Sequence, residues 1–296
     1  MLPLESVPNV SEGRDLDVVE AVAAAFASRG ARLLDVHSDV DHHRSVFTVV
    51  GDDRALEDSL VAGVAETRAR VDLREHVGVH PRVGAADVVP VVPLDPGDMP
   101  RAVATAAAVA RRVGEELELP VFLYGENGAG RRPAFFRRGG PEQLQRRIDS
   151  GEILPDHGPR RLDPAAGAVL IGARKPLVAY NVVLETTDAE VARAVAAAVR
   201  ESSGGLPGVQ ALGLELAEGG GGQVQVSINV VDLDATPLHV VAERVRAEAT
   251  ARGVSVGDAE LVGLLPVDAV VAASRGPLGL GRLARDRILE LRLVRA

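Results

Sequence analysis

The feature that most constrains the fold of this chain is a strand–turn–helix pattern that recurs along it. Apolar runs at 7–10, 88–93, 177–184 and 224–231 are each followed by a turn and then by an Ala-, Val- and Leu-rich segment. These segments predict helices over about 16–28, 100–117, 189–200 and 238–252. Pro100 and Pro237 suit a first helical turn, and Gly30 and Gly253 are typical of helix ends.

This alternation, with hairpin strands such as 44–51, predicts an α+β fold: ferredoxin-like layers in which helices cover one face of a mixed sheet. Residues 223–230 alternate polar and apolar, so one sheet face carries Gln, Ser and Asn. Such a face either meets solvent or faces a second polar sheet across a ligand. A Gly- and Pro-rich stretch at 151–167 precedes the expected boundary, which predicts subdomains at 1–175 and 176–296.

Composition argues against several classes of function. The formal net charge is −9, and aromatic residues make up 2% of the chain. An acidic surface repels phosphate backbones and few aromatics can stack on bases, so we expect no nucleic acid partner. The absence of cysteine excludes disulfides, thiolate nucleophiles and cysteine-bound metals. The N-terminal residues lack a signal-peptide pattern and proline interrupts runs such as 88–94, so we expect a cytoplasmic protein that enters no membrane.

The segment 75–87 is the richest in groups that can carry chemistry. Pro81 favours an extended backbone at His80, and Gly78 and Gly84 allow close approach of neighbouring backbone. Arg82 offers a fork for a carboxylate. An imidazole titrates near neutral pH, which suits proton transfer. From the residues alone, a structural loop and a catalytic loop both remain open.

Two other readings of the polar residues are less favoured. His76 and His80 have a spacing that binds metals on a helix, but Gly78 and Pro81 disfavour a helix and no His-Glu-x-x-His order is present. We therefore expect no metal. A metal-dependent hydrolase remains the alternative, and its ligands would come from His76, His80 and the cluster Asp39, Asp41, His42 and His43. The run 125–130 follows a strand but lacks the Gly-Lys-Ser/Thr ending of a phosphate loop. The arginines after it either hold carboxylates or solvate a loop: Arg131, Arg132, Arg137 and Arg138.

Several segments, in order along the chain, resemble the formiminotransferase domain family. They are Val7-Pro8-Asn9-Val10-Ser11-Glu12-Gly13, Leu34-Asp35-Val36 leading to Arg44-Ser45-Val46, His80-Pro81-Arg82-Val83-Gly84-Ala85-Ala86-Asp87-Val88, Leu123-Tyr124-Gly125-Glu126, Gly172-Ala173-Arg174-Lys175, Val226-Ser227-Ile228-Asn229 and Leu261-Val262-Gly263-Leu264-Leu265-Pro266. The sequence departs from the family in that His43 stands where Asn is frequent, and the loop 160–166 matches mainly in its bounding glycines.

The resemblance implies two α/β-layer subdomains whose sheets face one another across a folate-binding cleft. It implies that His80 is the catalytic acid–base residue and that 158–167 is a folate-contacting loop. With the matched motifs, the predicted substrate- and folate-binding residues are Arg82, Asp39, Tyr124, Gly125, Gly158, Pro159, Arg160, Arg161, Leu162, Asp163, Pro164, Gly167, Arg174 and Lys175.

The activity that the resemblance implies is transfer of the formimino group from N-formimino-L-glutamate to tetrahydrofolate, in histidine degradation and one-carbon metabolism. Tetrahydrofolate is then a co-substrate, and a separate cyclodeaminase is expected downstream; a homodimer is compatible with the sequence. In this hypothesis Arg82 and nearby arginines clamp carboxylates, and Asp39 or Asp41 stabilises the amidinium. The alternative is a folate-binding protein, or an enzyme acting on 5-formyl-tetrahydrofolate, without formimino transfer.

Overall fold

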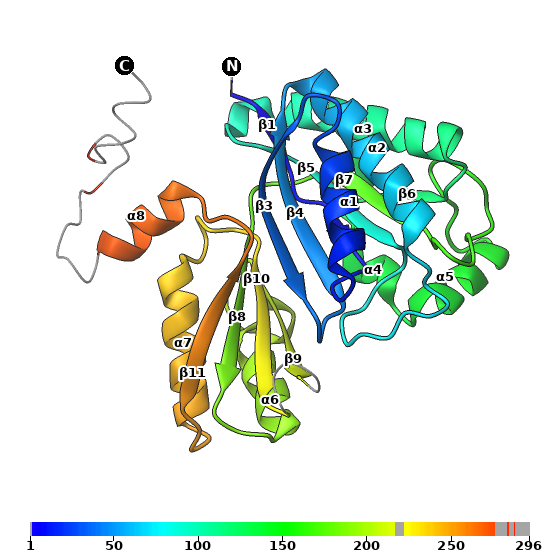
Figure 1. Cartoon of the computed structure of the whole chain (residues 1–296). Coiled ribbons are helices and arrows are strands. Elements are labelled where there is room, and N and C mark those ends of the chain that lie inside the picture. Colours follow the sequence, from blue (N-terminus) through cyan, green and yellow to red (C-terminus); the bar gives the residue numbers. More distant parts are fainter. Residues whose placement is uncertain (1, 217–221, 276–282, 284–286, 288–296) are drawn as a thin grey trace. The chain divides into compact units, whose positions relative to one another are not determined.

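The computed structural model describes residues 2–216, 222–275, 283 and 287, and the chain divides into two compact units, Met1–Lys175 and Pro176–Ala296 (Figure 1). Each unit combines one sheet with packed helices, so the predicted α+β class is confirmed. Within the described ranges, no helix has the length and apolar character needed to cross a membrane.

The first unit is built on a seven-stranded mixed sheet. Two short pieces, β1 (Leu4–Ser6) and β2 (Asn9–Val10), act as one strand, because each pairs antiparallel with β4 (Arg44–Gly51) on one side and β5 (Ala86–Pro93) on the other. β3 (Arg32–Asp39) pairs with β4. Beyond β5, the sheet continues in parallel through β7 (Val169–Ala173) to β6 (Val121–Leu123).

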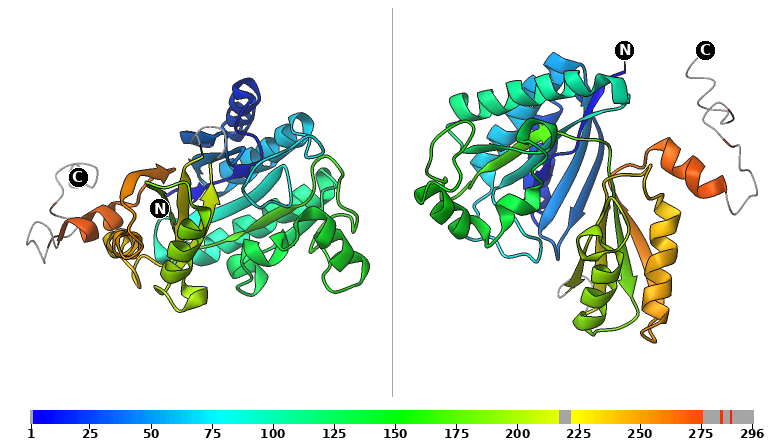
Figure 2. Two further views of the ribbon diagram at one scale, coloured as in Figure 1. Left: turned by 90° about the horizontal axis from the view of Figure 1, so that it is seen from below. Right: turned by 180° about the vertical axis from the view of Figure 1, so that it is seen from behind.

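Helices cover both faces of this sheet (Figure 2), so the expectation of helices on one face is wrong for the first unit. α1 (Leu16–Phe26), α2 (Asp53–Arg70) and α3 (Met99–Glu116) bury one apolar face. α4 (Pro133–Arg137) and α5 (Gly140–Asp149) bury part of the other face, next to β6 and β7. Because side chains alternate along a strand, Val89 and Ile171 join the first core, whereas Val88 and Leu170 join the second. Short 3₁₀ turns lie at η1 (Pro96–Asp98) and η2 (Gly125–Gly128).

The helix α2 lies outside the helices that the sequence pattern predicts. Its buried apolar side chains, among them Leu56, Leu60 and Val64, are separated by charged and small residues. This narrow stripe is weaker than the Ala- and Val-rich faces of the predicted helices. Asp52 nevertheless caps α2 by accepting from the Ala55 N–H, and Asp15 caps α1 in the same way.

The second unit has a four-stranded sheet in the order β11-β8-β10-β9. Its elements are β8 (Val178–Leu184), α6 (Ala189–Val199), η3 (Glu201–Ser203), β9 (Val209–Glu215), β10 (Val224–Val230), α7 (Leu238–Thr250), β11 (Val256–Val262) and α8 (Val267–Arg275). Every pairing in this sheet is antiparallel, so the predicted mixed sheet is wrong for this unit. Gln225, Ser227 and Asn229 share the face opposite the apolar core, as the alternating pattern predicts.

The two units share one topology. Both contain strand–helix–strand–strand–helix–strand, with the first strand of the six elements between the third and the fourth. This is the ferredoxin-like arrangement, and that prediction is confirmed. The first unit adds α3, β6, α4, α5 and β7, and the two additional strands run parallel to β5, which makes its sheet mixed.

Close packing of α1 against α2 depends on Gly63, and substitution there tests it. A Cβ atom at Gly63 would lie 2.0 Å from the ring of Phe26, which is fully buried and cannot move aside. We expect Gly63→Ala to lower the free energy of unfolding by about 1–3 kcal/mol, because overpacking forces the helices apart. Urea denaturation measures the change, and Ala24→Ser on the exposed side of α1 is the control. Equal stability of Gly63→Ala and the wild type would contradict this packing.

Candidate functional site

A buried carboxylate, Asp87, lies at the centre of the polar residues of the first unit. The pairing of β2 with β5 shifts register at this point, from Asn9–Val88 to Val10–Ala86, so Asp87 is the extra residue of a β-bulge. A bulge changes the direction in which a side chain points. The Asp87 side chain has no exposed surface, and its carboxylate accepts a hydrogen bond from the Val83 N–H at 2.8 Å.

Two arginines from distant parts of the chain neutralise this carboxylate. Arg44, at the start of β4, donates from Nη1 to Asp87 Oδ2 at 2.9 Å, and Arg137, at the end of α4, donates from Nη2 to the same oxygen at 2.5 Å. Burial alone would raise the pKa of Asp87, but Arg137 and Arg44 hold that pKa below its ordinary value. The carboxylate is therefore ionised at neutral pH.

The cations around Asp87 outnumber it. The pKa of Arg44 is lowered to about 10 by burial, with Asp87 opposing this shift and the charges of Arg137 and Arg82 adding to it. Arg44 also donates from Nε to Asn9 Oδ1 at 3.0 Å. Phe136 fixes the end of α4, since its buried ring packs 5.3 Å from the ring of Phe122. Arg137 is thus held by Phe136 on its own helix and by Asp87 on the sheet.

His80 lies beside this cluster, in the irregular segment that joins α2 to β5. The residue is partly buried, and its Nδ1 atom is buried without a hydrogen-bond partner in the described chain. Burial lowers the pKa of His80 well below 6.5, and the positive charges of Arg44 and Arg137 act in the same direction. The imidazole is therefore neutral at neutral pH and able to accept a proton.

Arg82 supports the loop that carries His80. Its Nη2 atom donates to the carbonyl oxygens of Gly78 at 2.6 Å and His80 at 3.0 Å. The guanidinium group that the sequence suggested for binding a carboxylate is therefore partly engaged in hydrogen bonds to the loop backbone. Gly84 is required for close approach, because a Cβ atom there would lie 1.8 Å from the carbonyl oxygen of Ala168.

The turn 40–43 forms a second support for the same loop. His43 has a left-handed backbone, with φ of 46°, and its ring lies between the Val77 carbonyl oxygen (Nδ1, 2.9 Å) and Glu12 Oε1 (Nε2, 3.1 Å). His76 stacks on His43 with ring centroids 4.0 Å apart, and His76 Nε2 donates to the His43 carbonyl oxygen at 2.9 Å. These contacts hold 76–80 against the end of β3.

Asp39, expected at the substrate, is engaged within the same turn. Its Oδ1 atom accepts from the His42 backbone N–H at 2.8 Å, and its Oδ2 atom lies 2.8 Å from His42 Nδ1. Burial would raise the pKa of Asp39, but His42 holds it below its ordinary value. The His42 ring lies 6.1 Å from the His80 ring, centroid to centroid, so the Asp39–His42 pair borders the catalytic candidate.

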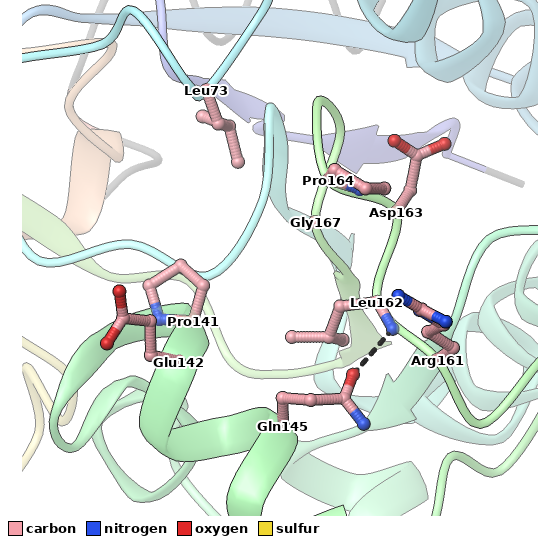
Figure 3. A pocket seen from close by; sticks show the side chains of 9 residues that line it. All are labelled: Leu73, Pro141, Glu142, Gln145, Arg161, Leu162, Asp163, Pro164 and Gly167. Atoms are coloured by element: carbon pink, nitrogen blue, oxygen red, sulfur yellow. Dashed lines mark hydrogen bonds between the residues drawn. The ribbon is translucent and has the colours of Figure 1, made fainter.

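The predicted folate loop lines a separate pocket of about 450 Å³ in the first unit (Figure 3). Leu73 and Leu162 extend toward its open centre. Asp163 holds the loop in shape by accepting from the N–H groups of Ala165 and Ala166 at 2.9 and 3.0 Å. The remaining lining residues come from α5 and from the loop: Pro141, Glu142, Gln145, Arg161, Pro164 and Gly167.

Other predicted residues lie in three kinds of environment. Tyr124 is buried, its hydroxyl has no well-directed hydrogen bond, and Arg174 and Arg137 lie near enough to oppose the rise in its pKa that burial causes. Gly125 and Gly158 serve backbone packing, because a Cβ atom at either would lie within 2.4 Å of a carbonyl oxygen. Exposed positions are occupied by Pro159, Arg160 and Lys175.

The run 125–130 does not form a phosphate loop. Its N–H groups at Gly125 and Gly130 bond to carbonyl oxygens of Arg131 and Gly125, and the Asn127 side chain ties it to α3 and β7. Sequence reasoning also missed Arg44 and Arg137 as the partners of Asp87. Their only signal was the position of Arg44 in a matched motif and of Arg137 in an arginine-rich segment.

The fold and this site define an α+β protein in which two ferredoxin-like units are joined, with a neutral histidine beside clustered arginines. The chain belongs to the formiminotransferase family. Residues 3–174 match the N-terminal subdomain of the formiminotransferase domain, and residues 179–276 match the formiminotransferase domain model that follows it.

Named relatives are similar over most of this chain. A glutamate formimidoyltransferase of Thermoplasma acidophilum is 40% identical and covers 99% of this chain and 98% of its own length. A glutamate formimidoyltransferase of Streptococcus pyogenes serotype M1 is 36% identical, with 90% of each chain covered. The formimidoyltransferase-cyclodeaminase of Rattus norvegicus is 36% identical over 92% of this chain but only 51% of its own length.

The stacked histidine turn predicts a pH dependence of stability. Burial lowers the pKa of His76 to about 4 from 6.5, so the unfolded chain binds a proton at a higher pH than the folded one. The neutral stack therefore stabilises the fold fully above pH 6.5, and this contribution is lost as the pH falls toward 4. We expect His76→Gln to show a smaller fall in melting temperature than the wild type between pH 6.5 and 4. His157→Gln is the control, and identical profiles for His76→Gln and the wild type would contradict the interpretation.

Proposed function

We propose that this chain transfers the formimino group of N-formimino-L-glutamate to tetrahydrofolate, yielding 5-formimino-tetrahydrofolate and glutamate. The observation that carries the proposal is the His80 imidazole, which is kept neutral by burial and by Arg44 and Arg137 and whose buried Nδ1 atom has no hydrogen-bond partner among the described residues. Relatives named glutamate formimidoyltransferase at 36–40% identity support the choice of reaction.

The proton transfers of this reaction require one group that both accepts and donates a proton. N5 of tetrahydrofolate attacks the amidine carbon of the donor and loses a proton as the new C–N bond forms. The tetrahedral centre then expels the glutamate nitrogen, which must gain a proton as its C–N bond breaks. A neutral His80 takes the first proton and returns it in the second step, a role typically worth about 10²–10⁴-fold in rate.

The arginines make the proton return favourable. An imidazolium formed at His80 is disfavoured by Arg44 and Arg137, so it readily gives its proton to the leaving nitrogen. The same residues favour a bound carboxylate, which places the glutamyl part of the donor next to the acid–base group. The chemistry consists of proton transfer and addition–elimination, and it needs no metal ion as a Lewis acid.

The pocket beside 158–167 is the proposed position of the tetrahydrofolate co-substrate. Leu73 and Leu162 provide an apolar lining that suits aromatic rings, and the exposed Arg160 and Arg161 lie on the same loop. Cations at the edge of such a pocket attract the carboxylates of a folate glutamate tail. Arg174 and Lys175 are retained as further candidates for contact with substrate, as is Gly125 through its backbone.

Replacement of His80 tests the proposed chemistry. We expect His80→Ala to lower kcat for formimino transfer by a factor of about 10² or more, because the acid–base group is lost. Formation of 5-formimino-tetrahydrofolate, followed by absorbance, measures this effect. Binding of folinic acid and the melting temperature should change little, and His239→Ala is the matched control. Retained turnover in His80→Ala would dismiss His80 as the acid–base group, and an inactive wild type that binds folinic acid would favour a folate-binding protein.

Replacement of Arg161 tests the proposed folate position. We expect Arg161→Ala to raise KM for tetrahydrofolate about 2–5-fold, the size of effect that an exposed ion pair produces, and to raise it less at high salt. KM for N-formimino-L-glutamate should stay as in the wild type. Arg138→Ala, which removes an exposed arginine outside this loop, is the control. An unchanged KM for tetrahydrofolate at low salt would place the folate tail elsewhere.

A further inference from the structure

The cluster around Asp87 carries an unbalanced positive charge. Arg44 and Arg137 both donate to Asp87, and Arg82 is near enough to lower the pKa of Arg44. One carboxylate therefore faces three guanidinium groups. Buried charges without counter-charges are costly in free energy, and a site of this kind gains stability when an anion binds.

Among the described residues, Asp87 is the acidic group that acts on both Arg44 and Arg82. Glu5, on β1, is a further buried carboxyl group of this unit, and it interacts electrostatically with a fourth arginine, Arg174. Burial raises the pKa of Glu5, and Arg174 opposes that rise. With Glu5 assigned to Arg174, the group formed by Arg44, Arg82, Arg137 and Asp87 keeps its excess of cations.

Two hydrogen-bond donors at this cluster have no acceptor in the described chain. They are the Nε–H of Arg137 and the hydroxyl of Tyr124, and both atoms are buried. Tyr124 is 3% exposed, and the charges of Arg137 and Arg174 act on its hydroxyl. A buried donor without an acceptor costs about 1–3 kcal/mol, so such groups are commonly completed by a ligand.

We propose that Arg137 and Tyr124 form the subsite that binds a carboxylate of the formimino donor. The inference rests on the proposed function and specifies which residues recognise that substrate. The Arg137 Nε–H and the Tyr124 hydroxyl donate to the carboxylate, while Arg137 remains bound to Asp87 through Nη2. Asp87 and the buried Phe136 ring hold the guanidinium in place before the ligand arrives.

The donor fits this subsite better than the folate tail does. In N-formimino-L-glutamate the α-carboxylate is attached to the carbon that bears the reacting nitrogen. In tetrahydrofolate the tail carboxylates are separated from N5 by the p-aminobenzoyl group. Arg137 acts electrostatically on both His80 and Tyr124, so an anion bound to it lies near the acid–base group. That position suits a carboxylate a few bonds from the reacting atoms.

Two variants remove the donors that have no acceptor in the described chain. Arg137→Lys keeps a positive charge for Asp87 but has no Nε–H, and Tyr124→Phe lacks the hydroxyl alone. We expect each variant to raise KM for N-formimino-L-glutamate about 10-fold or more, since a hydrogen bond to a charged group is lost. The inhibition constant of the product L-glutamate should rise in parallel. KM for tetrahydrofolate should stay within about 2-fold of the wild type, because the variants weaken the binding of the formimino donor alone.

Controls separate this inference from folding defects and from failure of the proposed function. Tyr180→Phe alters the other tyrosine of the chain, which packs against the core of the second unit, and it should leave both KM values unchanged. Melting temperature should change little in Tyr124→Phe, because the hydroxyl donates to no acceptor in the part of the chain that the structure describes. A wild type without formimino transfer would overturn the proposed function. If the wild type is active and both variants keep its KM for N-formimino-L-glutamate, the subsite alone is overturned. A rise confined to KM for tetrahydrofolate would also overturn it and would assign these residues to the folate tail.

Discussion

The ion pairing of Asp87 with Arg44 and Arg137 is the interaction on which the first unit depends. It joins β5 to β4 and to α4. Arg44 and Arg137 are 43 and 50 positions from Asp87 along the chain. Desolvating the carboxylate costs several kcal/mol, and removal of either arginine would leave part of that cost without compensation. The Val83 N–H bonds to the same carboxylate, so the loop that carries His80 is attached to the cluster as well.

The same charges connect structure to chemistry. Arg44 and Arg137 stabilise the ionised form of Asp87 and disfavour the ionised form of His80. One arrangement of cations therefore holds the sheet and α4 together and keeps the His80 imidazole neutral, and in the proposed reaction it also leaves positive charge for an anionic substrate. Electrostatic preorganisation of this kind needs no rearrangement when charge develops during the reaction.

Much of the fold could be predicted from the sequence, because alternation and capping are local properties. The helices that begin near Leu16 and Ala189 and the strand Arg44–Gly51 follow from their patterns. His80 could be selected because its neighbours match a known motif. The partners of Asp87 could not be predicted, since its direction depends on a β-bulge that has no local signature. The role of Arg82 as a brace depends on carbonyl positions that only the folded loop creates.

The left-handed backbone at His43 has a consequence for which residues this turn can accept. Non-glycine residues seldom adopt a positive φ, and Asn does so more readily than most. An Asn at this position would therefore satisfy the backbone geometry without the imidazole. An amide side chain relieves the torsional cost but is too short to reach both Glu12 and Val77. The His43 ring therefore connects two segments of the chain that Asn would leave without this link.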